Sequence, residues 1–344
     1  MVLFFVKAFD IIILILLTDG KPMKNKPKYT SIGGSALIEG VMMRGHGKMS
    51  IAVRRANGDI ALKIEDDKSP KGFYTKIPIV RGVIGFITSM VTSYKALMYS
   101  ADVSMEDISE QEKENGGEGI SKKLMNLLSI VAMVVGLLFG VLAFFYLPTL
   151  VADLFSKYVF ELGGVTKRVA VGVFKMLIFA CYLLAVSQMN DMKRVFMYHG
   201  AEHKTIFCHE AKGELTPAVA KTFKRFHPRC GTSFVIIVLI VSLFASLLIP
   251  WKTAALHTLL KLLFLPVVMG VAYECIKLAG RFDNVCTRII SAPGLWFQRI
   301  TTKEPDEDQL EVAIWAMRGV LEDFEKDVRF NISKDGIMTK YEDK

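Results

Sequence analysis

Four long apolar segments limit this chain to folds that can lie within a lipid bilayer. A helix needs about 20 apolar residues to cross roughly 30 Å of hydrocarbon, and its backbone polar groups must be bonded within the segment. The four segments are Leu124–Leu147, Val169–Gln188, Ser233–Ile249 and Leu259–Leu278. They predict a membrane α-helical protein with about four transmembrane helices. Buried core helices are the alternative interpretation of each segment.

The basic residues predict which side of the membrane each connection occupies. The connection 189–232 carries eight lysines and arginines, whereas 148–168 carries three and 250–258 carries one. Lysine and arginine concentrate on cytoplasmic loops, so we expect a multi-pass protein of the cell membrane with its N- and C-terminal parts in the cytoplasm. Nucleic-acid binding is another interpretation of a net charge of +9, but the topology explains the charge more simply, and no specific nucleic acid is expected.

The regions outside the spans predict strands near the N-terminus and helices elsewhere. Asn57-Gly58 is a two-residue hairpin signal because both positions accept a positive φ, and it separates the strand-like stretches Met49–Arg55 and Ile60–Glu65. Residues 77–101 have an apolar period near 3.6, which indicates an amphipathic or membrane-dipping helix. Pro305 and the acids that follow it favour the start of a C-terminal amphipathic helix.

These features divide the chain into six regions. Met23 opens a lysine-rich run and is the expected natural start. The expected regions are an N-terminal extension at 1–28, a small cytoplasmic β-rich domain at 29–76, the amphipathic or membrane-dipping helix at 77–101, an acidic linker at 102–122, the four-helix transmembrane region at 123–280 with a cytoplasmic His/Cys loop at 189–232, and a cytoplasmic tail at 281–344. The tail is expected to hold a loop with Pro293-Gly294 and the helix at 305–324.

The basic loop contains the motif His-x-x-Glu-His, formed by His199, Glu202 and His203. Imidazoles at i and i+4 lie on the same face of a helix. That spacing lets both bind one Zn²⁺ while the Glu acts as a base on metal-bound water, as in the inverted zincin motif. The motif therefore predicts a metal site with Glu202 as the catalytic residue.

Three interpretations of the surrounding histidines, cysteines and acids remain open. In a catalytic set, Glu274 would join His199 and His203 as the third ligand, although it can instead pair with Lys277 or Arg281 on its own helix. In a structural set, Cys208, His227 and Cys230 would join one of the motif histidines in a closed tetrahedral site. Without a metal, the same groups would bond one another and the backbone.

Four charged residues are further site candidates. Glu39 and Arg44 stand in a glycine-rich segment, residues 33–45, and glycine density suggests a positive φ or a close approach to a ligand. This segment is not a P-loop, because His46 stands where a lysine is needed. Lys204 adjoins the His-x-x-Glu-His motif, and Arg229 lies beside Cys230.

The chain resembles the bacterial YqhQ-like family of membrane proteins, which contain a domain of unknown function. The resemblance rests on motifs that extend from about residue 30 to the C-terminal helix: Gly33-Gly34-x-Ala36 with Glu39-Gly-Val-Met-Met-Arg44-Gly45, His199-Gly-Ala-Glu-His-Lys204, His227-Pro-Arg-Cys-Gly-Thr-Ser-Phe234, and Pro305-Asp306 with Glu311-Val-Ala-Ile314. It implies a predicted metal-dependent enzyme. The first 22 residues lie outside the family pattern.

Two classes of function follow from these observations. The first is an integral membrane protein with a cytoplasm-facing, metal-dependent and hydrolytic site, with zinc as the expected cofactor. The second is a non-enzymatic assembly or scaffold protein. Its His/Cys cluster would be structural, and its basic cytoplasmic face would bind a protein partner or anionic lipid in addition to the surrounding bilayer.

The charge asymmetry predicts the accessibility of each connection. A cysteine introduced at Lys157 or Lys252 should react with a membrane-impermeant maleimide in intact cells, because both connections are expected outside. A cysteine at Lys212 should react only after the cells are opened. Labelling is compared with the parent protein, which carries five natural cysteines. Reaction at position 212 from outside would contradict the assigned topology.

Overall fold

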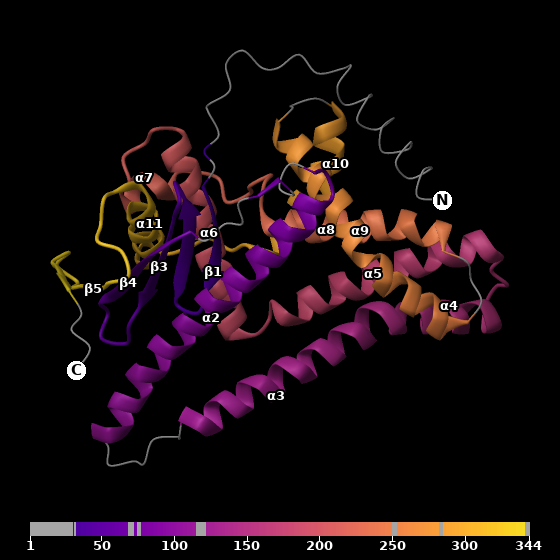
Figure 1. Ribbon diagram of the computed structural model, residues 1–344, viewed down its shortest axis with the longest axis horizontal. Helices are drawn as coiled ribbons and strands as arrows, with labels where there is room; N and C mark the ends of the chain where they lie inside the picture. Colours follow the sequence, from indigo (N-terminus) through magenta and orange to yellow (C-terminus); the bar gives the residue numbers. More distant parts are fainter. Residues whose placement is uncertain are drawn as a thin grey trace.

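The molecule has a sheet-containing layer at one end and a bundle of long helices at the other (Figure 1). The computed structural model describes residue 30 and residues 32–67, 72–73, 77–114, 122–249, 253–281 and 285–340. The expected N-terminal extension and the expected start at Met23 lie outside the described residues.

Six antiparallel strands form one sheet in the order of the sequence. The strands are β1 (Gly33–Leu37), β2 (Gly40–Gly45), β3 (Lys48–Arg54), β4 (Ile60–Asp66), β5 (Arg329–Ile332) and β6 (Met338–Lys340). The two strands predicted on either side of Asn57-Gly58 are β3 and β4, and Gly58 has a φ of +91°. The N-terminal strands do not form the sheet alone, because β5 from the C-terminal tail pairs with β4.

Both faces of the sheet are buried. Along each strand, successive side chains point alternately to one face and to the other. Helices α6 (Asn190–Glu210) and α11 (Glu307–Leu321) cover one face, where Leu62 and Ile64 of β4 meet Met317 of α11 in a continuous core. The other face presents Ile51 and Val53 of β3 to helix α2 (Val80–Glu114). Helix α11 lies within the predicted range 305–324, and Asp306 caps its N-terminus with a capping box.

The structure corrects the prediction of an acidic linker at 102–122. Helix α2 continues through Glu114, and the residues that follow, 115–121, lie outside the described part. The acidic stretch is helical because part of it is used in packing. Val103 is buried against the sheet, and the Asp107 carboxylate accepts hydrogen bonds from Arg55 Nε at 3.0 Å and from the Ala56 amide at 2.7 Å. The amphipathic helix predicted at 77–101 is thus the N-terminal part of a longer helix.

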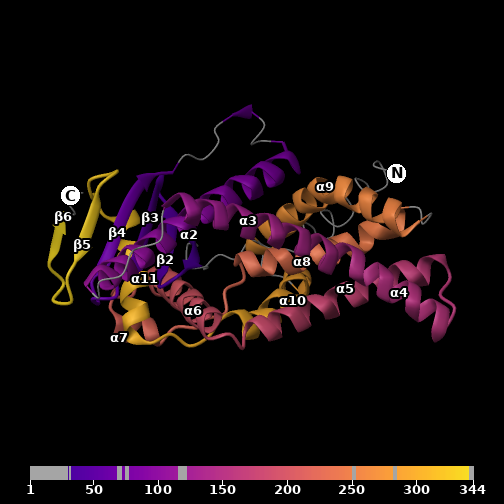
Figure 2. The ribbon, with the colours of Figure 1, turned by 90° about the horizontal axis from the view of Figure 1, so that it is seen from below.

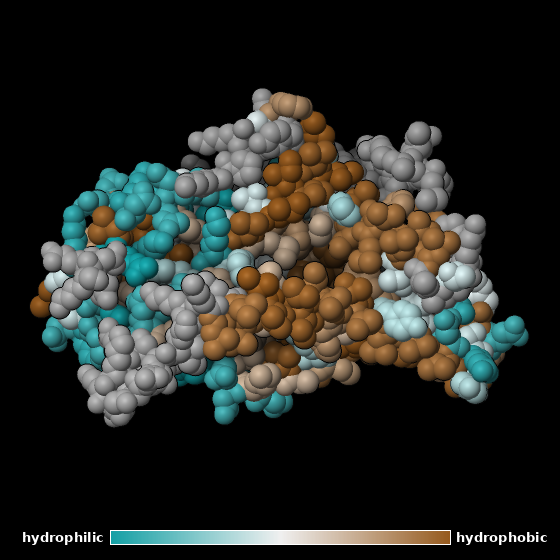
Figure 3. Space-filling view, turned by 60° about the horizontal axis from the view of Figure 1, so that its bottom comes forward, coloured by the Kyte–Doolittle hydropathy of each residue, from teal (hydrophilic) through white to brown (hydrophobic). Residues whose placement is uncertain are grey.

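Within the described residues, four candidate membrane-spanning helices lie where the apolar segments predicted them. They run from Ile130 to Tyr158, Gly164 to Val186, Gly231 to Leu248 and Leu256 to Lys277. The first comprises most of α3 (Lys122–Val141), a π-helical turn (Leu142–Tyr146) and α4 (Leu147–Tyr158), and the others are α5 (Gly164–Val186), α8 (Gly231–Leu248) and α9 (Ala254–Arg281). Figure 3 shows apolar side chains over this end and hydrophilic ones over the sheet end.

A further helix replaces the loop predicted around Pro293-Gly294. Helix α10 (Val285–Thr301) packs against α8 and α9, as Figure 2 shows from below. Gly294 allows this contact, since a Cβ at this position would lie only 2.6 Å from Ser233 Oγ on α8. Through α10, the end of the bundle reaches the sheet layer. The predicted loop 189–232 is also largely helical, because it comprises α6 and the short helix α7 (Pro217–Lys221).

The segment 29–75 is predicted not to fold when it is isolated. In the full chain, Val41, Met43 and Leu62 form one core with α6 and α11, and β4 bonds to β5. Without those elements, these side chains would return to water, and the segment is too small to bury another core. Circular dichroism and amide hydrogen exchange of the isolated segment should show no cooperative unfolding transition. A sigmoidal denaturation curve would contradict this prediction.

Candidate metal centre

Helix α6 presents His199 and His203 to the junction between the sheet layer and the bundle. The two imidazole centroids are 4.4 Å apart, as the i, i+4 spacing predicted. Helix α6 is fixed on one side by α11, β1 and β2. Its histidine face meets the end of α10, the loop before α8, and the first residue of α8.

Both imidazoles are oriented by backbone carbonyls. His199 Nδ1 lies 2.9 Å from the Thr301 carbonyl oxygen, and His203 Nδ1 lies 2.5 Å from that of Arg225. A carbonyl oxygen only accepts, so each Nδ1 carries the hydrogen and each Nε2 is left to act as a ligand. Metal-binding histidines are oriented in the same way by a hydrogen bond from their second nitrogen.

Cys230 supplies a third potential ligand at the same point. Its Sγ lies 3.0 Å from His199 Nε2, and the ligand atoms of the three residues lie within 4.8 Å of one another. Cys230 is the N-cap residue of α8, and its sulfur accepts a hydrogen bond from the Thr232 amide. The positive end of the helix dipole and this N–H both favour the thiolate form. His199, His203 and Cys230 are hereafter called the ligand group.

Glu202 lies beside the ligand group and is buried, with 5% of its surface exposed. Its carboxylate receives a hydrogen bond from the Gly34 amide of β1. The strand approaches so closely that a Cβ on Gly34 would lie 3.1 Å from the Glu202 Cδ. Burial raises the pKa of the carboxyl above its ordinary value, although the nearby imidazoles of His203 and His199 oppose the rise. The carboxylate is thus held next to the ligand group in a desolvated position, where its affinity for a proton is increased.

The charges within the ligand group favour a deprotonated Cys230 thiolate beside a protonated, positively charged His199 imidazole. Burial alone would raise the pKa of the Cys230 thiol, but His199 and His203 lower it well below its ordinary value. Burial also opposes a charge on His199, yet Cys230 raises the pKa of that imidazole to about 9. A proton on His199 Nε2 therefore faces the thiolate. A metal ion would replace that proton and be held by the same three residues.

The glycine within the motif has a packing role. A Cβ on Gly200 would lie 2.0 Å from the Lys303 carbonyl oxygen. The Lys303 amide donates to the Phe196 carbonyl of α6 at 2.8 Å, which fixes the segment after α10 against the helix. Since this segment follows Thr301, the close approach at Gly200 also positions the carbonyl that orients His199.

The structure separates the other predicted ligands from the ligand group. Cys208 is buried in the core below the sheet, where its Sγ lies 3.3 Å from the Glu214 carbonyl oxygen. Glu274 accepts two hydrogen bonds from Arg81 of α2, so its carboxylate is held at the contact between α2 and α9 and not in the ligand group. The predicted alternative partner Arg281 lies outside the residues whose side chains are described. The geometry thus combines two motif histidines from the catalytic set with Cys230 from the structural set.

His227 lies close to His203, but its ring accepts a hydrogen bond from the backbone of the loop before α8. Their ring centroids are 5.5 Å apart. Burial, together with the charges of His203 and Arg229, lowers the pKa of His227 to about 2, so the ring is neutral. Its Nδ1 is 3.3 Å from the Arg229 amide. Its ring therefore contacts the ligand group without belonging to it.

The four charged candidates form ion pairs around the centre. The Glu39 carboxylate pairs with Arg194 and accepts a hydrogen bond from the Tyr198 hydroxyl at 3.1 Å, and Arg194 holds the pKa of that carboxyl low despite burial. The remaining pairs are Arg44 with Asp67, Lys204 with Glu304, and Arg229 with Glu210. Lys204 Nζ also donates to the Lys221 carbonyl at 2.8 Å, which links α6 to α7.

Sequence reasoning missed Gln298, the residue that positions the loop before α8. Its buried amide accepts from the His227 amide at 2.8 Å and donates to the His227 carbonyl at 2.7 Å and to Ser233 Oγ at 2.9 Å. These bonds hold the two sides of Cys230 in place. Gln298 lies in the tail between the predicted loop at Pro293-Gly294 and the predicted helix at 305–324, and a single glutamine there carries no signal of its partners. The signal for Gly34 was present, since the glycine density of its segment predicted a close approach.

Comparisons with known proteins show the family to which the chain belongs. A family model described as "Protein of unknown function (DUF1385)" matches residues 77–323. The chain belongs to this family. It is also 34% identical over 294 residues to the uncharacterized protein YqhQ of Bacillus subtilis (strain 168), a match that covers 84% of this chain and 92% of that protein. No solved structure matches significantly. The matched DUF1385 region contains the whole ligand group and Glu202, whereas Gly34 lies before it.

The close contact at Gly200 predicts that a larger residue at this position lowers the stability of this DUF1385 protein. Gly200→Ala should lower the midpoint of thermal unfolding in detergent, because the added Cβ meets the Lys303 carbonyl at 2.0 Å. The expected cost is about 1–3 kcal/mol, although alanine is the better helix former by about 1 kcal/mol. Gly231→Ala is the matched control, since a Cβ there meets nothing within 4 Å. Equal midpoints for the two variants would contradict the assigned contact.

Proposed function

We propose that this protein is a zinc-dependent hydrolase whose site lies where the sheet layer joins the membrane-spanning helices. The observation that carries the proposal is the orientation of the two imidazoles. Each Nδ1 is bonded to a carbonyl oxygen, His199 Nε2 lies 3.0 Å from the Cys230 sulfur, and ligand atoms of all three residues lie within 4.8 Å of one another. His203 is 1% exposed, and its Nε2 has no hydrogen-bond partner within the described structure. A buried imidazole nitrogen without a partner is costly unless a ligand satisfies it.

The donor set favours zinc. Two imidazole nitrogens and a thiolate suit this ion better than Mg²⁺ or Ca²⁺, which take oxygen ligands. Tetrahedral ligand atoms at the usual zinc distances are roughly 3.5 Å apart. The group observed here, within 4.8 Å, reaches that geometry by adjustment of side chains. With three protein ligands, Zn²⁺ keeps a fourth position for water and lowers the pKa of that water to about 7.

Glu202 would act as the general base. It is next to the ligand group, is buried, and has a raised pKa. Hydrolysis joins the hydroxyl of water to an electrophilic carbon or phosphorus atom. Glu202 would accept the proton released from that water and pass it to the leaving group. The Gly34 amide holds the carboxylate in place, so the acceptor needs no reorganisation during the reaction.

The side of the membrane follows from the charge distribution. The connection with eight basic residues contains α6 and the ligand group, and basic loops favour the cytoplasm. We therefore propose a cytoplasm-facing centre in a multi-pass cell-membrane protein.

A structural metal in a non-enzymatic scaffold is the second candidate. One observation favours it: Gln298 and the Arg229–Glu210 pair hold the Cys230 loop rigidly between the two halves of the molecule. A metal there would cross-link α6 to α8. A closed structural site would require a fourth protein ligand, and a catalytic site would keep an exchangeable water.

Metal analysis of purified variants tests the proposal. His203→Ala and Cys230→Ser should each lose the bound zinc, because each removes a ligand. Glu202→Gln should retain zinc and fail to complement a deletion strain, because only the base is removed. Elemental analysis by mass spectrometry after purification without chelators gives the metal content of each variant.

Cys208→Ser is the matched control for the cysteine ligand. Cys208 is equally buried but lies outside the ligand group, bonded to the Glu214 carbonyl. This variant should retain zinc. Metal-free wild-type protein that still complements would end the metalloenzyme proposal. Full complementation by Glu202→Gln with retained zinc would favour the structural site.

A further inference from the structure

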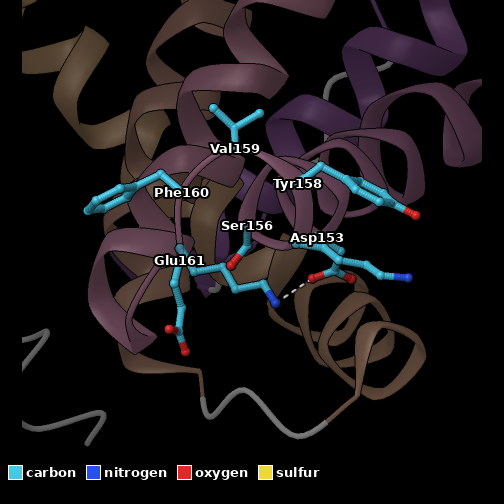
Figure 4. Close-up of a pocket in the computed structure, with 8 residues that line it drawn as sticks. Asp153, Ser156, Tyr158, Val159, Phe160 and Glu161 are labelled. Atoms are coloured by element: carbon cyan, nitrogen blue, oxygen red, sulfur yellow. Dashed lines mark ion pairs between the residues drawn. The ribbon is translucent and has the colours of Figure 1, made fainter.

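Two of the hollows in the described structure differ in what surrounds them. One of about 500 Å³ lies at the turn between α4 and α5, at the end of the bundle away from the sheet (Figure 4). Lys167 pairs with Asp153 there at 2.5 Å, so the two charges satisfy each other. The other, a cleft of about 870 Å³, is lined by Gly34 and Cys230. It therefore reaches both the strand that holds Glu202 and a member of the ligand group.

The walls of this cleft are membrane-spanning or membrane-adjacent. Phe234 and Val235 come from α8, Tyr273 and Ile276 from α9, and Ile84 and Phe86 from α2. The first four belong to candidate spans. The rings of Phe86 and Phe234 are 5.3 Å apart, which joins α2 to α8 along the apolar wall. The hydrocarbon layer is thus continuous with one side of the cleft.

Helix α2 presents an apolar stripe to the outside beside the cleft. Counted from Ile87, its exposed members lie seven residues before and three, four, seven and ten residues after: Val80, Met90, Val91, Tyr94 and Leu97. This spacing places them on one face of the helix. An exposed apolar face on a helix at the border of a membrane region is typical of a helix that lies in the lipid interface. Met90 belongs to both the stripe and the cleft lining, so the apolar stripe borders the cleft.

Cationic side chains predominate in the charged lining of the cleft, which consists of Arg44, Arg81, Arg229, Lys277 and Asp67. Arg44 is paired with Asp67, Arg229 with Glu210 and Arg81 with Glu274, so these four cations exceed their three carboxylate partners by one positive charge. Arg81 is held by the buried Glu274 through Nε and Nη2. A guanidinium has five N–H donors, so this pair positions Arg81 while leaving its Nη1 donors for an anion. Basic pockets between spanning helices bind the headgroups of anionic lipids.

We propose that the cleft binds a membrane amphiphile with an anionic headgroup, and that this amphiphile is the substrate class of the candidate centre. The headgroup would lie among the arginines near Cys230. One acyl chain would follow the wall of Phe86 and Phe234 to Met90. The assignment of this lipid as the substrate rests on the proposed hydrolase function. The proposal that the lipid binds depends only on the cleft. Glu274, predicted as a metal ligand, becomes the residue that positions Arg81 for the headgroup.

Photo-crosslinking in vesicles tests this proposal. The full-length protein is reconstituted in phosphatidylcholine with a phosphatidylglycerol that carries a diazirine in its acyl chain. Adducts are mapped by proteolysis and mass spectrometry. Peptides from 84–93 and 231–235 should be labelled, and adducts on α3 serve as the internal reference, because that helix faces lipid along most of its length.

Two tryptophan variants of α2 separate binding in the cleft from general contact with lipid. Ser89→Trp should fill the cleft and lower its adducts several-fold relative to α3, because Ser89 lines the cleft. Ile87→Trp adds a similar bulk at an exposed position outside the lining and should leave the ratio unchanged. Equal ratios in the two variants would overturn the proposal.

Competition and metal analysis distinguish the remaining outcomes. Unlabelled phosphatidylglycerol should reduce the cleft adducts more than phosphatidylcholine does, and equal competition would overturn the anionic headgroup. Displacement by an apolar peptide in preference to phosphatidylglycerol would assign the cleft to a protein segment and overturn the lipid. Zinc is measured on the same samples. Cleft adducts on zinc-free protein would overturn only the hydrolase, and zinc without cleft adducts would overturn only the lipid assignment.

Discussion

Two hydrogen bonds, from His199 and His203 to backbone carbonyls, determine what the centre of this molecule can do. They fix the hydrogen on Nδ1 and leave each Nε2 as the potential ligand atom, and His199 Nε2 lies beside the Cys230 sulfur. The carbonyls belong to Thr301, the last residue of α10, and to Arg225, in the loop before α8. The orientation of the imidazoles therefore requires that α6, α10 and the loop before α8 be packed together. This requirement links the sheet layer to the membrane-spanning bundle.

The buried polar contacts at this junction form a connected set. Gln298 bonds both backbone groups of His227 and the Ser233 hydroxyl, and so fixes the backbone on each side of Cys230. Glu202 is held by the Gly34 amide from the opposite side. Buried polar groups of this kind are stable only when each has a partner. His203 Nε2 is a buried polar atom of the ligand group that has no hydrogen-bond partner within the described structure, and a bound ligand would satisfy it.

The same junction connects the candidate centre with the bilayer. The cleft is bounded by the α8 residue that supplies the sulfur and by apolar side chains of α2, α8 and α9. The Arg81–Glu274 pair lies where α2 crosses α9, and Gly82 and Gly270 allow the two helices to approach closely there. A carboxylate in a spanning helix is costly unless it is paired. Here the pair fixes an arginine at the border between the apolar wall and the polar end of the cleft.

The sequence by itself determined the four apolar helices, the β3–β4 hairpin and the presence of His199 and His203 on one helical face. Each depends on local periodicity or on turn chemistry, which residues close in the chain encode. Tertiary structure decided the rest. Cys230 rather than Glu274 completes the ligand group, because α8 begins beside α6, while α2 places Arg81 against Glu274. The pairing of β4 with β5 and the contacts of Gln298 likewise join residues far apart in the chain. No single segment specifies such contacts, because they depend on how all the helices pack together.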